Sequence, residues 1–146
     1  DLKIERTDAL VEISHGLWEG KLEAEIREKW PALLKNWHDK PEEVIMPEGE
    51  SIKDVSERSV EAFDKICSSQ KDNDLSLLVA HDAVNKTLIC NILSISYSNI
   101  WMIKQGNGGI TIIDLFNDRN KPPVISALNI TTHLGGIIDS TASGAL

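Results

Sequence analysis

Residues 75–83 read LSLLVAHDA, an uninterrupted apolar run that ends in a histidine and an aspartate. An apolar run such as 75–80 is typical of a strand that is buried on both faces of a sheet. Residues 83–93 return to apolar positions at helical spacing, and Asp82 is placed to cap the start of that helix. The order of strand, His81 and helix predicts an α/β fold with a parallel or mixed sheet.

The junction that carries His81 has the features of an anion-binding site. The free N–H groups and the positive end of the helix dipole point to the place where the imidazole arrives. Open α/β sheets bind ligands at the carboxyl ends of their strands, which is where His81 falls. Spacing alone leaves two interpretations open: His81 contacts a phosphate, or it only satisfies hydrogen bonds at the end of the strand.

The remaining chain alternates helical and extended patterns. Ser51 and Asp54 form a capping-box signature ahead of apolar residues at three-to-four spacing, so a helix is predicted from Ser51 onward. Pro31 ends one helical pattern and is suited to open the next. In chain order, the patterns predict a strand end at 10–13, helices at 21–30 and 32–38, a loop at 41–49, and a hairpin of strands at 109–116 and 124–129.

Composition limits the class of protein. The 146 residues are 41% hydrophobic, which supports one domain with a sizeable core. The formal charge is −8 and the basic residues form no cluster, so no nucleic-acid partner is expected. No stretch approaches the roughly 20 apolar residues of a membrane span, so no membrane partner is expected either. Cys67 and Cys90 lie among apolar neighbours, as the reduced core thiols of a cytoplasmic protein do.

Glu12 is a second candidate for chemistry. It follows two apolar residues at the end of a presumed strand. A partly buried carboxylic acid can have its pKa raised and can then protonate a leaving group. Taken alone this signal is weak, because most glutamates are solvated surface charges. No two histidines stand at metal-ligand spacing with a carboxylate, so neither a metal nor another cofactor is expected.

Taken together, these segments resemble the histidine phosphatase superfamily, the phosphoglycerate-mutase-like proteins, in their order and separations. Residues 12–20, EISHGLWEG, resemble the "E…G.WEG" segment of that family. Residues 47–58 resemble its "P.GES..DV..R" segment, and 79–81 resemble the strand that carries its second histidine. Residues 108–111 and 128–134 resemble the closing strands of the family. The family branch most similar to this chain is that of the cyanobacterial and plant 2-carboxy-D-arabinitol-1-phosphatases, on the basis of residues 82–87 and 127–146.

The resemblance implies a three-layer fold, with helices flanking a mostly parallel sheet. A partial domain is expected over residues 1–138, lacking the family's N-terminal strand and helix, and a flexible tail over 139–146. The chain begins with Asp1 and leads straight into a motif, which favours a fragment or a processed piece. The family's Arg-His-Gly triplet, which supplies the nucleophilic histidine, is not among these residues, so this chain alone is expected to be inactive.

The resemblance also implies site roles. Glu12 matches the general acid, His81 matches the second histidine that contacts the phosphoryl group, and the backbone N–H of Asp82 would be a further donor. Many members have glycine where this chain has Asp82, whose carboxylate would repel a phosphate unless it turned back to cap the helix. Lys86 could offset that charge; the alternative is a solvated lysine.

Ser51 and His15 are the remaining candidates for contact with a phosphate or substrate. Each also has a structural explanation. Ser51 is already accounted for as a helix cap, and His15 can hydrogen-bond to nearby backbone beside Gly16.

The sequence therefore predicts a phosphomonoesterase that acts through phosphohistidine on a small phosphorylated metabolite. The alternatives are a phosphoglycerate mutase and a non-catalytic binding or assembly module of the same fold. In the family the strand at 75–80 lies beside the nucleophile strand, so here its bare edge is expected to pair with the missing N-terminal segment or with a second copy. The expected location is the cytoplasm, or the chloroplast stroma if the source is a plant. All of this requires that Glu12 and His81 converge.

Overall fold

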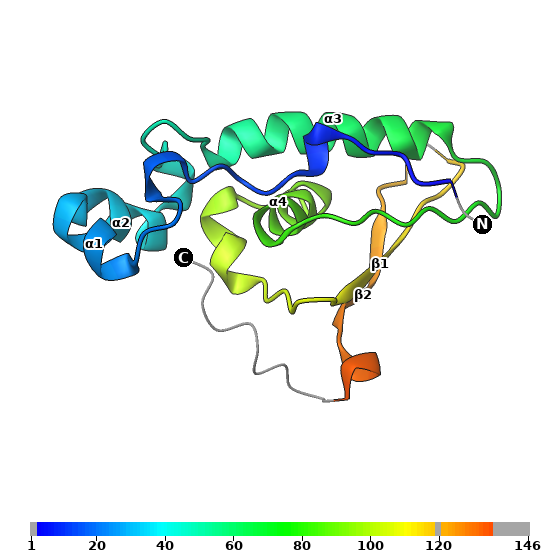
Figure 1. Cartoon of the computed structure of the whole chain (residues 1–146). Coiled ribbons are helices and arrows are strands. Elements are labelled where there is room, and N and C mark those ends of the chain that lie inside the picture. Colours follow the sequence, from blue (N-terminus) through cyan, green and yellow to red (C-terminus); the bar gives the residue numbers. More distant parts are fainter. Residues whose placement is uncertain (1–2, 119–120, 136–146) are drawn as a thin grey trace.

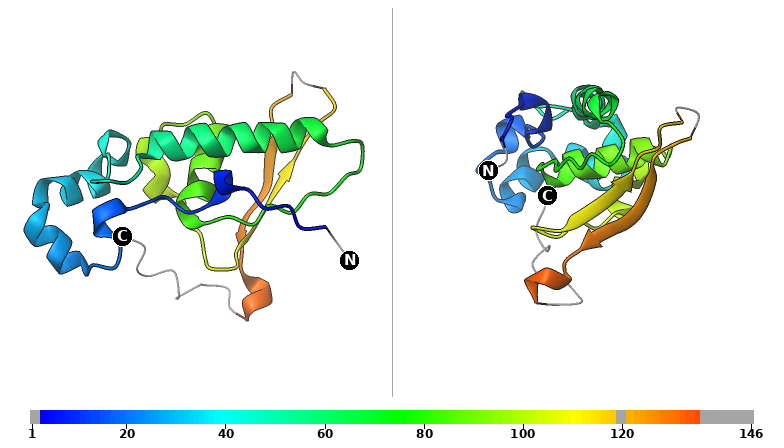
Figure 2. Two further views of the ribbon diagram at one scale, coloured as in Figure 1. Left: turned by 45° about the horizontal axis from the view of Figure 1, so that its top comes forward. Right: turned by 90° about the vertical axis from the view of Figure 1, so that its right-hand side faces the viewer.

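The computed structural model describes residues 3–118 and 121–135, and Figure 1 shows how its elements are arranged. Helix α3 lies against α4, and the N-terminal segment runs along α3. The strands β1 and β2 form a hairpin to one side of these helices (Figure 2). The bounds are α1 Glu23–Lys29, α2 Pro31–Asp39, α3 Ile52–Ser69, α4 Asp82–Ile92, β1 Ile110–Asp114 and β2 Val124–Ile130, joined by loops and short 3-10 turns.

The four helices occur where the sequence predicts them, and α3 begins at the predicted capping box. The hydroxyl of Ser51 accepts a hydrogen bond from the N–H of Asp54 at 3.2 Å. In return the carboxylate of Asp54 accepts one from the N–H of Ser51 at 2.8 Å. These two bonds satisfy backbone donors that the first turn of a helix leaves free, and they fix where α3 begins.

The hydrophobic core lies between α3, α4 and the segments that pack on them. The buried residues of α3 recur at helical spacing and include Val55 and Phe63. Helix α4 is buried over most of its length and contributes Val84 and Ile89. Trp37 of α2 is also fully buried, so the short helices α1 and α2 share this one core with the longer pair.

The predicted hairpin is confirmed, and the predicted strand at 75–80 is wrong. β1 and β2 pair antiparallel, with two shifts of register. Residues 75–80 are extended but belong to no strand, and Leu75, Leu77 and Val79 are 96%, 80% and 79% exposed. The apolar run predicts burial on both faces, but the described residues supply no neighbouring strand and cover only one face, where Leu78 and Ala80 pack on the core. The only sheet in residues 3–118 and 121–135 is the two-stranded hairpin, so these residues do not form the expected mostly parallel, three-layer arrangement.

The strand end predicted at 10–13 is also wrong. Residues Asp8–Leu10 form a 3-10 turn, and residues 11–15 have no strand partner within the described chain. A side chain from α3 holds this segment, as described below, so it needs no backbone ladder. The isolated apolar residues there resemble a strand only locally.

The two cysteines are free thiols, as predicted. Cys90 is buried in α4 and Cys67 is half-buried in α3, and burial raises the pKa of both thiols. Among residues 3–118 and 121–135, no helix has both the length and the hydropathy to cross a bilayer. The tail predicted at 139–146, and the end of the domain predicted at 138, lie outside the described residues.

Candidate active site

Glu12 and the beginning of α4 are in direct contact, although they are far apart in the sequence. One carboxylate oxygen, Oε2 of Glu12, accepts a hydrogen bond from the backbone N–H of Asp82 at 3.1 Å. The other, Oε1, accepts one from the N–H of Ile13 at 2.9 Å. His81 directly precedes Asp82, and Glu12, His81 and Asp82 all line the same cavity. The carboxylate of Glu12 therefore lies at the helix end that directly follows His81.

The start of α4 favours negative charge beside His81. α4 has 11 residues, so its first N–H groups and its dipole place partial positive charge at this end. His81 is the N-cap, but its side chain makes no capping hydrogen bond and is exposed. The imidazole is consequently not committed to the helix. The N–H of Asp82, predicted as a phosphate donor, is instead occupied by Glu12.

Two expectations about α4 are wrong. Asp82 is the first helical residue rather than the cap, and its carboxylate accepts a hydrogen bond from Nζ of Lys86 at 2.8 Å. Lys86 is not a solvated lysine: it is 8% exposed, and its Nζ lies 5.0 Å from the ring centroid of Trp101. An ion pair and a cation–π contact therefore hold Lys86 against the wall of the cavity. The negative charge of Asp82 is compensated at the place where a phosphate would otherwise be repelled.

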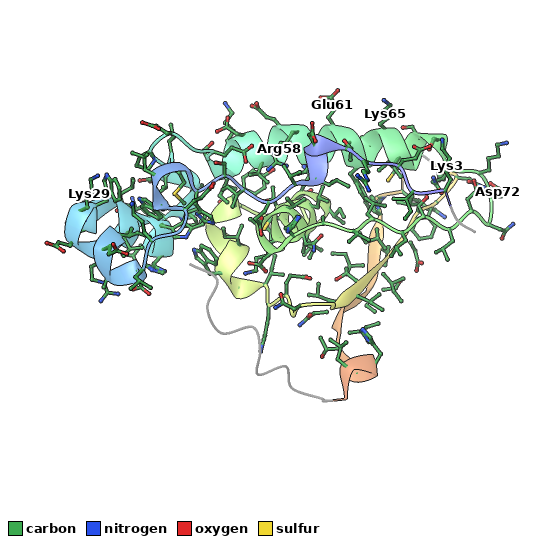
Figure 3. The ribbon with its side chains drawn as sticks, in the orientation of Figure 1. Lys3, Lys29, Arg58, Glu61, Lys65 and Asp72 are labelled. Atoms are coloured by element: carbon green, nitrogen blue, oxygen red, sulfur yellow. The ribbon has the colours of Figure 1, made fainter. Side chains whose placement is uncertain are left out.

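Arg58 on α3 holds the segment that carries Glu12. Figure 3 shows Arg58 where α3 faces the N-terminal segment. Its guanidinium donates to the carbonyl oxygens of Ala9, Val11 and Glu12 at 2.9, 2.8 and 3.2 Å. Three bonds from one side chain fix the path of the backbone directly before the carboxylate of Glu12.

Glu50 holds Arg58 in turn. Arg58 makes a two-pronged ion pair with both carboxylate oxygens of Glu50, at 2.8 and 2.9 Å. The N–H of Ser14 donates to the same carboxylate at 2.9 Å. The Arg58 guanidinium is the main reason why the pKa of Glu50 is lowered from its ordinary value. Sequence analysis gave neither residue a role; the only signal was that Glu50 and Arg58 both belong to the "P.GES..DV..R" segment.

Two glycines allow the Glu12 loop to lie against the loop that precedes α3. Gly16 has φ of +54°, and a Cβ there would lie 2.1 Å from the carbonyl oxygen of Pro47. A Cβ on Gly49 would lie 2.4 Å from the carbonyl oxygen of Ser14. Two backbone hydrogen bonds of 2.8 Å join the two loops. The N–H of Leu17 donates to the carbonyl oxygen of Pro47, and the N–H of Glu50 donates to the carbonyl oxygen of Ser14. Only glycine permits this approach.

The other two predicted site residues do not line the cavity of Glu12 and His81. Ser51 is committed to the capping box. His15 is half-buried, meets the ring of Trp37 edge-on at 5.9 Å, and its Nδ1 has no hydrogen-bond partner among the described residues. Burial lowers the pKa of His15, while the carboxylates of Glu12 and Glu19 act in the opposite direction. The expected hydrogen bond from His15 to backbone is not seen at that atom.

The cavity itself is large and open, with a volume of about 2020 Å³. Glu12, His81, Asp82 and Lys86 line one part of it, and residues 75–80 and 109–116 line much of the remainder. No cluster of three or more potential metal ligands occurs in residues 3–118 and 121–135. Glu12, His81 and the start of α4 together provide a carboxyl group, an imidazole and a helix N-terminus, which are groups that can bind and protonate the oxygens of a phosphate ester.

Known proteins share both the sequence and the fold of this chain. It is 32% identical over 135 residues to phosphoserine phosphatase 1 of Hydrogenobacter thermophilus, which covers 92% of this chain and 62% of that protein. It is 25% identical over 120 residues to the 2-carboxy-D-arabinitol-1-phosphatase of Triticum aestivum, covering 82% of this chain and 24% of that protein. This chain therefore spans less than two thirds of the length of either relative.

Solved structures agree with these relatives. YhfR of Bacillus stearothermophilus superposes with a TM-score of 0.75 at 26% identity, over 83% of this chain and 58% of that one. A phosphoserine phosphatase mutant from Entamoeba histolytica, solved in complex with phosphoserine, gives a TM-score of 0.75 at 25% identity, over 92% and 66% of the two chains.

A family model settles the assignment to which these likenesses point. The model described as the histidine phosphatase superfamily (branch 1) matches residues 1–130, which is most of the chain. The same residues include Glu12, His81 and the loops that position them. The chain belongs to the histidine phosphatase superfamily.

Proposed function

We propose that this chain is the acid-bearing part of a phosphomonoesterase that works through a phosphohistidine intermediate. Glu12 is the general acid, and His81 contacts the phosphoryl group. The observation that supports the proposal most is the hydrogen bond from the N–H of Asp82 to Glu12, at 3.1 Å, because it brings the carboxyl group to the helix end next to His81. Ser51 caps α3 and His15 packs against Trp37, and neither lines the cavity.

The proposed reaction has two steps. A nucleophilic histidine attacks phosphorus, the P–O bond to the substrate breaks, and Glu12 gives its proton to the leaving oxygen. The Glu12 carboxylate then takes a proton from water as that water attacks the phosphohistidine, which releases inorganic phosphate and restores both groups. No Arg-His-Gly triplet occurs in the 146 residues, so the nucleophile comes from another segment of polypeptide, and these residues alone are inactive.

The substrate we propose is a small phosphorylated metabolite. The relative at 32% identity is a phosphoserine phosphatase, and the structure from Entamoeba histolytica holds phosphoserine. The chain carries a formal charge of −8, so local donors at the start of α4 have to attract an anionic substrate against the overall field. Phosphoserine is accordingly the first substrate to test.

Replacing His81 by alanine is expected to lower phosphate release by about 10²–10³-fold, the usual loss when one donor to a transition-state oxygen is removed. The measurement uses a chimera in which residues 1–130 of this chain replace the matching region of phosphoserine phosphatase 1, with phosphoserine as substrate. His38→Ala is the matched control, because His38 is exposed at the end of α2. His81 has no catalytic role if the His81→Ala chimera stays within threefold of the unmodified one.

Removing the positive charge of Lys86 is expected to weaken substrate binding rather than the chemical step. Lys86→Met leaves the Asp82 carboxylate uncompensated on the cavity wall. We expect KM of the same chimera to rise by about tenfold, which corresponds to roughly 1.4 kcal/mol, with kcat nearly unchanged. Adding Asp82→Asn should restore KM, because the repelling charge is then gone. An unchanged KM in Lys86→Met would show that the pair only supports the helix.

A further inference from the structure

Trp101 is a large aromatic side chain in the wall of the cavity that contains Glu12 and His81. It belongs to the 3-10 helix Tyr97–Met102, which lies against α4 (Figure 1). Trp101 lines the cavity and is half-buried, so part of its surface is open to a ligand. The reaction proposed above gives this side chain no role.

Helix α2 holds Trp101 in place. The Nε1 of Trp101 donates a hydrogen bond to the carbonyl oxygen of Trp37 at 2.9 Å. The two rings also meet edge to face, with their centroids 5.1 Å apart, and Trp37 itself is fully buried. A side chain fixed in this way loses little conformational freedom when a ligand packs on it, so the contact with the ligand is not offset by ordering.

Lys86 connects Trp101 with the start of α4. Its Nζ lies 5.0 Å from the centroid of the Trp101 ring and 2.8 Å from the carboxylate of Asp82. One side chain therefore spans from Trp101 to the helix end at which Glu12 accepts its hydrogen bond from the N–H of Asp82. Trp101 consequently lies beside the place proposed for the phosphoryl group.

A second route of contacts leads from Glu12 to the same tryptophan. His15 follows Glu12 in the same loop; burial lowers the pKa of His15, and the nearby Glu12 carboxylate acts in the opposite direction. His15 packs on Trp37, and Trp37 holds Trp101. Trp101 is thus linked to Glu12 both through α4 and through the Glu12 loop. A leaving group that takes its proton from Glu12 emerges on this side of the helix end, toward Trp101.

We propose that Trp101 contacts the leaving group of the substrate and selects phosphate esters whose leaving group has an apolar, planar surface, such as the ring of an aryl phosphate. The inference rests on the proposed function, because that function places the leaving group at Glu12. Lys86 and Asp82 compensate each other's charge beside Trp101, so this pair offers no net charge to a charged leaving group. An aromatic leaving group gains a ring contact with Trp101 instead.

Two phosphonates that cannot be hydrolysed test the contact directly. Phenylphosphonate and methylphosphonate share the phosphonate group and differ in the ring. In the chimera with phosphoserine phosphatase 1, isothermal titration should show phenylphosphonate binding at least about tenfold more tightly. Trp101→Ala should reduce this difference to less than about threefold and leave the dissociation constant of methylphosphonate unchanged. Trp101→Phe keeps a ring at the position and should retain most of the preference.

Kinetics with phosphotyrosine and phosphoserine separate this inference from the proposed function. Both substrates are amino-acid phosphates, and the leaving group of phosphotyrosine adds a ring. Trp101→Ala should raise KM for phosphotyrosine about tenfold more than KM for phosphoserine. An inactive chimera that still prefers phenylphosphonate contradicts the proposed function and leaves the contact with Trp101 intact. An active chimera without that preference contradicts this inference alone.

Trp30→Ala is the matched control. Trp30 is likewise half-buried, packs on another tryptophan, Trp18, and has the Nζ of Lys29 4.5 Å from its ring centroid, but it does not line the cavity. This variant should leave the preference for phenylphosphonate unchanged. The inference is overturned if neither phosphonate binds the chimera, if the two bind equally, if the preference survives Trp101→Ala, or if Trp30→Ala abolishes it as well.

Discussion

Glu12→Gln in the chimera with phosphoserine phosphatase 1 is expected to lower kcat for phosphoserine by about 10²–10⁴-fold, the contribution of a positioned general acid. Glutamine has one amide oxygen, so it can accept only one of the two hydrogen bonds that Glu12 receives from Ile13 and Asp82. The bonds from Arg58 to the preceding carbonyl oxygens remain, so the loop should keep its place. What glutamine cannot do is give a proton to the leaving oxygen. KM should therefore change little.

A second substrate separates acid catalysis from simple positioning. Nitrophenyl phosphate has a leaving group that departs without protonation, so Glu12→Gln should lose much less activity with it than with phosphoserine. Glu28→Gln is the control, because Glu28 is exposed on α1. Equal losses on both substrates would mean that Glu12 acts through structure, and a loss below threefold on phosphoserine would remove it from the mechanism.

The parts of the fold that short-range patterns determine could be predicted. The start of α3 follows from two residues three apart, Ser51 and Asp54, and the structure has both of the expected bonds. The hairpin of β1 and β2 follows from two apolar runs separated by a turn, and it too is present. In each case the interaction partners lie within a few residues of one another or across one turn, so the sequence contains the whole interaction.

Where the prediction fails, the partner lies far away in the sequence or is not found among the described residues. Residues 75–80 have the composition of a buried strand, but no described residue pairs with them and every second side chain is exposed. Residues 10–13 resemble a strand, although Arg58 of α3 holds them through their carbonyl oxygens. A solvated Lys86 was one of two interpretations left open, because nothing local reveals that its Nζ lies over the ring of Trp101. The meeting of Glu12 with α4 was predicted only through the family resemblance, since no local pattern links residues so far apart.

Replacing Arg58 by methionine is expected to destabilise the 146-residue chain by about 2–4 kcal/mol. The change leaves the Glu50 carboxylate without its ion-pair partner and the carbonyls of Ala9, Val11 and Glu12 without a donor. This expected loss of stability is smaller than that for breaking a fully buried ion pair, because the side chains of Arg58 and Glu50 are 20% and 25% exposed. Arg27→Met is the control: it breaks an exposed ion pair with Glu23 on α1 and should cost less than about 0.5 kcal/mol.

The same variant should also change how stability depends on pH. Arg58 lowers the pKa of Glu50 in the folded state from its ordinary 4.5, and the N–H of Ser14 adds to this, while burial and nearby Asp54 act in the opposite direction. Below pH 4.5 the unfolded chain therefore binds more protons at Glu50 than the folded chain does, so this contribution to stability is present above 4.5 and is lost as the pH falls toward the folded pKa. In Arg58→Met the pKa values of Glu50 in the folded and unfolded states approach each other, and the fall of the unfolding free energy below pH 4.5 should become shallower.

Urea unfolding of the wild type, Arg58→Met and Arg27→Met across this pH range measures both the loss of stability and its pH dependence. If Arg58→Met costs no more than Arg27→Met, or leaves the acid slope unchanged, then Arg58 does not hold the Glu12 segment in solution.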